Sequence, residues 1–98
     1  MAYHFTAETR GPKAPPLLQD RLARYTLIEF FTVEVSSDAL TVGISVPFRS
    51  LSEPGLNSEL VDLMNYLILD QDFEVTDLFT GRRIGPDEVA GLLDRISS

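Results

Sequence analysis

The chain has 98 residues, a formal net charge of −7 and no cysteine. Its length suits one small domain, residues 1–98, and its 44% apolar composition argues against disorder. The missing cysteines exclude disulfides, thiolate nucleophiles and zinc–thiolate sites, and they favour a cytoplasmic location. No apolar run approaches the ~18 residues of a membrane span, so we expect no membrane partner.

The negative charge is concentrated in the middle of the chain. Residues 26–80 carry one base, Arg49, against ten acids, a net charge of −9, whereas residues 1–25 carry a net charge of +2. A negative field of this size disfavours direct binding to nucleic acid or to an anionic membrane. It favours a basic protein surface as the partner. Solubility alone is the alternative explanation.

The first 25 residues predict a strand and a short helix. In residues 2–9, Tyr3 and Phe5 fall on one face of an extended chain. A helix over residues 16–25, with a proline in its first turn, places Leu18, Leu22 and Tyr25 on one stripe.

Residues 27–48 predict a β-hairpin, which is the strongest local pattern in the chain. Apolar and polar residues alternate through both halves, with many β-branched and aromatic side chains. Residues 36–38 supply the turn. One face of the first strand is expected to carry Glu29, Phe31, Val33 and Val35. One face of the second strand is expected to carry Leu40, Val42, Ile44, Val46 and Phe48. Phe30 is expected on the opposite face, with Thr32 and Glu34.

The next element is a helix over residues 57–69, with Asn57 as its N-cap. Its apolar arc is wider than one sheet face requires, so a second cover is expected. The final helix is one candidate for that cover, and a partner chain is the other. The arc comprises Leu60, Val61, Leu63, Met64, Leu67 and Ile68.

The C-terminal third predicts a strand over residues 73–79, a turn at Thr80 and Gly81, and a short returning strand over residues 82–84. Pro86 then opens a final helix. Its buried stripe is expected to be Val89, Leu92, Leu93 and Ile96.

The resulting order is β-α-β-β-α-β followed by a C-terminal helix. It predicts an α+β fold of the ferredoxin-like, split βαβ type, with helices on one face of an antiparallel sheet. This fold hosts many unrelated functions, so it does not indicate one by itself.

The sequence offers no constellation for catalysis, and we expect no enzyme, cofactor or metal site. His4 is the single histidine, and no nucleophile elbow surrounds any serine. The spacing of Asp70, Asp72 and Glu74 resembles the start of a calcium loop. The loop fails at its sixth position, Val75, where glycine is needed, and at its twelfth, Gly81, where a carboxylate is needed.

Two neighbouring arginines, Arg82 and Arg83, precede the final helix. A helix N-terminus with arginines can bind an anion, so these residues are the best candidate for a small anionic ligand. The alternative is that both arginines neutralise nearby acids.

The favoured hypothesis is a non-enzymatic interaction module that covers a basic partner surface with an acidic patch, as an inhibitor or an immunity or antitoxin-like protein would. That comparison is one of composition. The alternative is an anion sensor or a small subunit of a homo-oligomer, dimeric through the hairpin edge or the helix over residues 57–69. The predicted partner-binding residues are Glu59, Asp62, Asp70, Asp72, Glu74 and Asp77.

Overall fold

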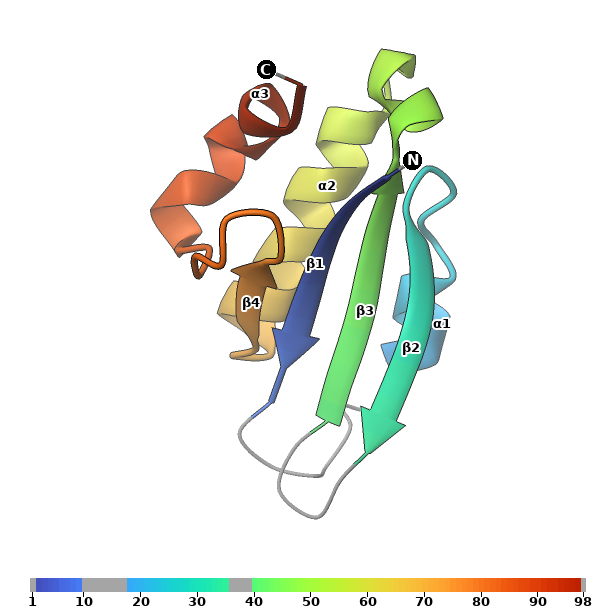
Figure 1. Ribbon diagram of the computed structural model, residues 1–98. Coiled ribbons are helices and arrows are strands. Elements are labelled where there is room, and N and C mark those ends of the chain that lie inside the picture. Colours follow the sequence, from blue (N-terminus) through green and yellow to red (C-terminus); the bar gives the residue numbers. More distant parts are fainter. Residues whose placement is uncertain (1, 10–17, 36–39, 98) are drawn as a thin grey trace.

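The computed structural model describes residues 2–9, 18–35 and 40–97, and for residues 31–35 and 97 it describes the backbone alone. Four antiparallel strands form one sheet, and the helices pack against one of its faces (Figure 1). Across the sheet the order is β2-β3-β1-β4. The predicted α+β fold with an antiparallel sheet is therefore confirmed. The strands are β1 (Ala2–Glu8), β2 (Glu29–Val35), β3 (Leu40–Pro47) and β4 (Glu74–Asp77).

The first crossover connects β1 to β2. Both strands are antiparallel to β3, which lies between them, so they run in the same direction. A connection that passes over one intervening strand is what the split βαβ unit of the ferredoxin-like prediction requires. Residues 10–17 of this connection lie outside the described residues, as does the predicted hairpin turn at residues 36–38. The ferredoxin-like topology therefore stays a prediction.

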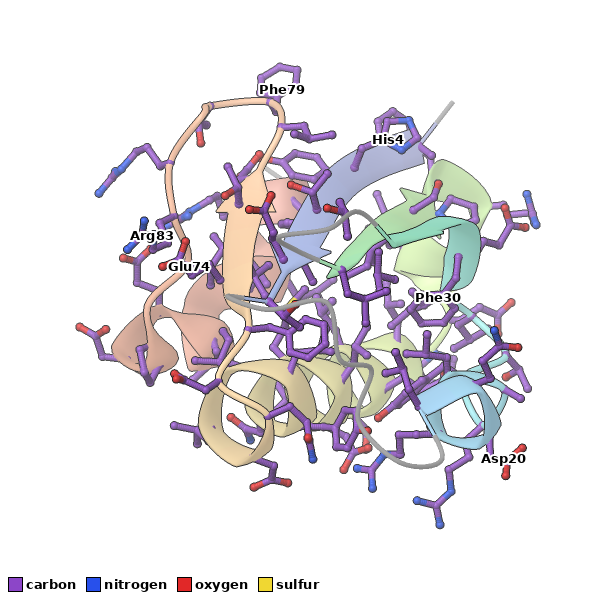
Figure 2. The ribbon with its side chains drawn as sticks, turned by 90° about the horizontal axis from the view of Figure 1, so that it is seen from below. His4, Asp20, Phe30, Glu74, Phe79 and Arg83 are labelled. Carbon is purple, nitrogen blue, oxygen red and sulfur yellow. The ribbon has the colours of Figure 1, made fainter. Side chains whose placement is uncertain are left out.

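β1 has one buried and one exposed face. Tyr3, Phe5 and Ala7 are buried against the helices, whereas His4 and Glu8 are exposed. Figure 2 shows His4 on the side of the sheet away from the helices. The alternation follows from the two-residue period of a strand, so the side of each β1 residue was predictable from the chain.

The regular alternation predicted for the first hairpin strand is wrong at Phe30. Phe30 lies opposite the fully buried Ile44, and Thr32 lies opposite the next residue of β3, Gly43. One extra residue, Phe31, is accommodated between them as a β-bulge. The bulge reverses the alternation, and half-buried Phe30 consequently packs against the core.

β3 lies in the middle of the sheet and supplies much of the core, because its predicted apolar residues from Leu40 to Val46 are fully buried. Phe48, predicted on the same face, is not part of the strand. It begins a 3-10 helix, η1 (Phe48–Ser52), and is 43% exposed. The strand pattern therefore overran its true end by one residue.

The first helix, α1 (Leu18–Leu22), is shorter than the predicted range of 16–25 at its C-terminal end. After Leu22 the amide of Tyr25 bonds three residues back, to the Leu22 carbonyl at 3.3 Å, so the chain tightens into a turn. Leu18, Leu22 and Tyr25 are nevertheless buried together, as the predicted stripe requires.

The predicted helix over residues 57–69 is present as α2 (Leu56–Asn65) followed by a π-helical turn, η2 (Tyr66–Asp70). Asn57 is not its N-cap, because the helix starts one residue earlier, at the fully buried Leu56. The apolar arc packs on the sheet and also on the C-terminal helical segment, which provides the second cover. Its fully buried members are Leu60, Leu63, Met64 and Leu67.

After β4 the chain turns and comes back beside it. Arg83 forms an isolated bridge with Thr76, and the Ile84 amide donates to the Val75 carbonyl at 2.8 Å. The predicted returning strand is thus reduced to one bridge, which covers the outer edge of β4. The strand predicted over residues 73–79 ends earlier, at Asp77.

The final helix begins at Pro86, as predicted, but its first half is a 3-10 helix, η3 (Pro86–Gly91), which continues into α3 (Leu92–Ser97). Val89, Leu92 and Ile96 join the core. In the part of the chain that the structure describes, no helix is both long enough and apolar enough to cross a membrane.

Candidate functional site

The tight junction between η2 and β4 holds two acidic side chains outside the core. The amide of the buried Phe73 donates to the Leu67 carbonyl at 2.7 Å, which ties the junction to the helix. Between them Asp72 has a φ of 57°, a left-handed conformation that aspartate adopts more readily than most residues. Asp70 and Asp72 are both exposed.

Two further carboxylates come from the sheet. Glu8, the last residue of β1, lies directly opposite Glu74, the first residue of β4. Both lie on the helix-free face, since they alternate with the buried Ala7 and Val75. Like charges directly opposite one another destabilise a sheet. Arg83 offsets part of this cost, because its Nη2 lies 3.4 Å from Glu74 Oε2 (Figure 2).

We call Glu8, Asp70, Asp72 and Glu74 the acidic end of the molecule. They lie at one end of the sheet, because β1 ends where β4 begins and because Asp70 and Asp72 directly precede β4 (Figure 1). By backbone register Glu34 belongs to the same cross-strand row as Glu8, with Thr41 between them. The negative potential of the four carboxylates of the acidic end is suited to a cationic partner.

The acidic end contains three of the six acidic residues predicted to bind a partner, namely Asp70, Asp72 and Glu74. The sequence did not predict Glu8 as a partner-binding residue, because it lies in residues 1–25, whose net charge is positive. The period of two in β1 is the signal that could have found it. That period places Glu8 on the face of His4 and Thr6.

Glu59 lies elsewhere, because it binds the segment that follows α1. Its Oε1 accepts a hydrogen bond from the Leu27 amide at 3.0 Å, and its Oε2 accepts one from Thr26 Oγ1 at 3.1 Å. Both carboxylate oxygens are therefore engaged in holding the chain between α1 and β2 against α2.

Asp62 also faces this segment. Its Oδ2 accepts hydrogen bonds from the Tyr25 hydroxyl at 2.7 Å and from Arg21 Nη2 at 2.9 Å. The Arg21 guanidinium in turn lies over the Tyr66 ring, 4.6 Å from its centroid, in a cation–π contact. These contacts dock α1 on α2. Beside them is a shallow polar depression of about 250 Å³, lined by Arg24, Tyr25, Ser58, Glu59 and Asp62.

The hydrogen bond from Tyr25 is the main cause that lowers the pKa of Asp62, and the positive charge of Arg21 adds to it. Burial, followed by the bond to Asp62, raises the pKa of Tyr25 to about 12. Each group is thus held in the protonation state that preserves the contact at neutral pH.

We expect Asp62→Asn to lower the free energy of unfolding by about 1 kcal/mol at pH 7. A carboxyl group with a lowered folded-state pKa stabilises above its unfolded pKa of about 3.9, and this contribution is lost as the pH falls. Urea unfolding at pH 7 and pH 3 should therefore show the two proteins converging in acid. A difference that is equally large at pH 3 would contradict the role of the charge. Glu53→Gln, at an exposed acid, is the control.

Asp77 does not contribute to an exposed acidic surface, because its side chain is fully buried. Its Oδ2 accepts a hydrogen bond from the Tyr3 hydroxyl at 2.5 Å, and its Oδ1 accepts from the amides of Phe79 at 2.8 Å and Thr80 at 3.3 Å. Asp77 is therefore a structural residue that fixes the turn after β4.

The two arginines predicted to bind an anion are not gathered around one site. Arg83 is paired with Glu74, whereas Arg82 is exposed beside β4. The first turn of η3 carries Asp87 and Glu88, whose negative charges oppose an anion at that position.

Comparison of the chain with protein-family models, with curated proteins and with solved structures gives no match. Within the described residues, no three histidine, aspartate or glutamate side chains are grouped so that they could hold a metal ion.

Proposed function

We propose that the protein is a non-enzymatic binding module that covers a basic protein surface with its acidic end, in the manner of an inhibitor. The observation that carries the proposal is the placement of Glu8, Asp70, Asp72 and Glu74 where β1 ends and where η2 leads into β4. Complementary charge speeds encounter and selects among partners more than it sets affinity. The lack of cysteine favours a cytoplasmic location for this activity.

The opposed pair Glu8 and Glu74 supports this proposal. Two carboxylates in register across neighbouring strands cost stability, and Arg83 offsets part of this cost at Glu74. Features that reduce stability are expected where function requires them. A cationic partner would neutralise the two carboxylates and relieve their repulsion. The free energy that this repulsion costs in folding would then favour binding.

The alternative of an anion sensor has less support. Arg83 is engaged with Glu74, and two carboxylates lie in the first turn of η3. The apolar arc of α2 is covered by the protein's own core, so it adds no reason to expect a dimer through that helix. Pairing through the edge of β2 stays a prediction.

We expect the double substitution Glu8→Lys and Asp70→Lys to lower the association rate with the partner about tenfold at low salt. The physical reason is the loss of electrostatic steering at the acidic end. The partner would be captured from cells at low salt and purified, and association would then be followed by stopped-flow fluorescence at two salt concentrations.

The matched control is Asp20→Lys with Glu53→Lys, which changes the net charge equally at two exposed acids outside the acidic end. If the control slows association as much as the test variant, net charge and not the acidic end is responsible. Failure to recover any protein partner at low salt would also overturn the proposal.

A further inference from the structure

We infer that the turn after β4 is a second docking element, which inserts Phe79 into an apolar pocket of a partner protein. We call Leu78 and Phe79 the apolar tip. Phe79 is 84% exposed and Leu78 is 51% exposed. Figure 2 shows Phe79 at the outer end of this turn, on the side away from the helices. The inference goes beyond the proposed function, since the apolar tip follows the last residue of β4 and the acidic end includes the first.

The exposure of the apolar tip needs an explanation beyond ordinary surface composition. Single apolar residues scattered over a surface are common. Here two large apolar residues, Leu78 and Phe79, are adjacent in one turn, and the polar residues Thr80 and Arg82 follow them. Aromatic side chains, including phenylalanine, are enriched in protein interfaces relative to the rest of the surface.

The backbone of the apolar tip is held by a buried carboxylate. Asp77 Oδ1 accepts from the amides of Phe79 and Thr80, and the Asp77 carbonyl accepts from the Gly81 amide at 2.7 Å. Gly81 has a φ of 73°, a conformation that suits glycine. Burying a carboxylate costs free energy, and the hydrogen bonds that it accepts offset that cost. The same hydrogen bonds order the turn.

The Phe79 ring is also oriented. It stacks on the Tyr3 ring with 5.7 Å between centroids and 29° between planes, while the Leu78 amide donates to the His4 carbonyl at 3.1 Å. Covering Tyr3 does not by itself explain why a phenylalanine stands here, because most of the Phe79 surface remains exposed. A side chain that is already ordered loses little conformational entropy on binding, so its burial adds more to affinity.

The shape and charge of this element select the occupant. A projecting ring requires a concave apolar pocket, and the exposed Arg82 beside it favours acidic groups at the rim of that pocket. The depression between α1 and α2 of a second copy does not suit the Phe79 ring, because polar residues line it. An anionic membrane is opposed by the net charge of −7. We therefore assign the apolar tip to a partner protein with an apolar pocket.

The test places the photo-crosslinking residue benzoylphenylalanine at position 79 or, as a control, at the 43% exposed Phe48, which belongs neither to the acidic end nor to the apolar tip. After irradiation in living cells we expect one discrete adduct with another protein from position 79 and none from position 48. With the crosslinked protein purified, Phe79→Ala should weaken its binding at least tenfold, mainly through faster dissociation. Phe79→Tyr should retain most of the affinity.

An adduct with a second copy or with lipid, or no adduct above the control, would overturn the inference. Equal affinity of the Phe79→Ala protein would overturn it too. An unchanged melting temperature establishes that this variant is folded. The two proposals can fail separately. Loss at the apolar tip changes dissociation with little salt dependence, whereas Glu8→Lys with Asp70→Lys changes a salt-dependent association rate.

Discussion

Replacement of Asp77 with alanine is expected to lower the free energy of unfolding by about 2–4 kcal/mol. The carboxylate is fully buried and accepts hydrogen bonds from the Tyr3 hydroxyl and from the amides of Phe79 and Thr80. Alanine removes all three acceptor contacts and leaves three donors without partners in or near the interior. Urea unfolding followed by far-ultraviolet circular dichroism measures the loss.

The exposed Asp70→Ala is the matched control and should stay within about 0.5 kcal/mol of the parent. Asp77→Asn should lose less than Asp77→Ala, because the amide oxygen can still accept from the turn. If Asp77→Ala proves as mild as the control, the carboxylate does not organise this region. A double-mutant cycle with Tyr3→Phe isolates the share of the loss that belongs to the Tyr3–Asp77 bond.

Alkali is expected to destabilise the protein by about 4 kcal/mol between pH 10 and pH 12. Burial, followed by the hydrogen bond to Asp77, raises the pKa of Tyr3 to about 12, and burial also raises the pKa of Tyr25 to about 12. A raised folded-state pKa means that the stabilisation is complete below the unfolded pKa of about 10. It is lost as the pH rises toward 12, because the unfolded chain ionises first.

Denaturant unfolding at pH 9.5 and pH 11.5, together with tyrosinate absorbance at 295 nm, measures both parts of this prediction. The absorbance at 295 nm has no tryptophan background, because the chain has no tryptophan. Tyr3→Phe and Tyr25→Phe should each lose stability at pH 7, yet each should remove about half of the decline in alkali. Ionisation of both side chains near pH 10 in the folded protein would contradict it.

The local elements of the fold were largely predictable, because the spacing of apolar residues within a short segment identifies each of them. Alternation in residues 2–8 and 40–46 identified two strands, and the apolar arc that includes Leu60 and Leu67 identified the main helix. The errors occur where contacts from elsewhere decide. The bulge at Phe31 serves the fit of β2 to β3, and the strand after Phe73 ends where Asp77 turns the chain.

The candidate site was predictable only in part for the same reason. Asp70, Asp72 and Glu74 are close in the chain, so their proximity in space follows from their positions. Glu8 joins them through pairing between β1 and β4, which local patterns do not encode. Asp77 looked like one more surface acid, since its partner Tyr3 lies 74 positions away in the chain.

By itself, the order of residues determined the fold class, the apolar faces of most strands and helices, and the excess of acid in the middle of the chain. Only the tertiary structure decided which carboxylates face solvent, which one is buried, and that Phe79 projects from a braced turn. Local periodicity reports the face on which a side chain lies. The contacts of that face depend on strand order and register, because these bring distant parts of the chain together.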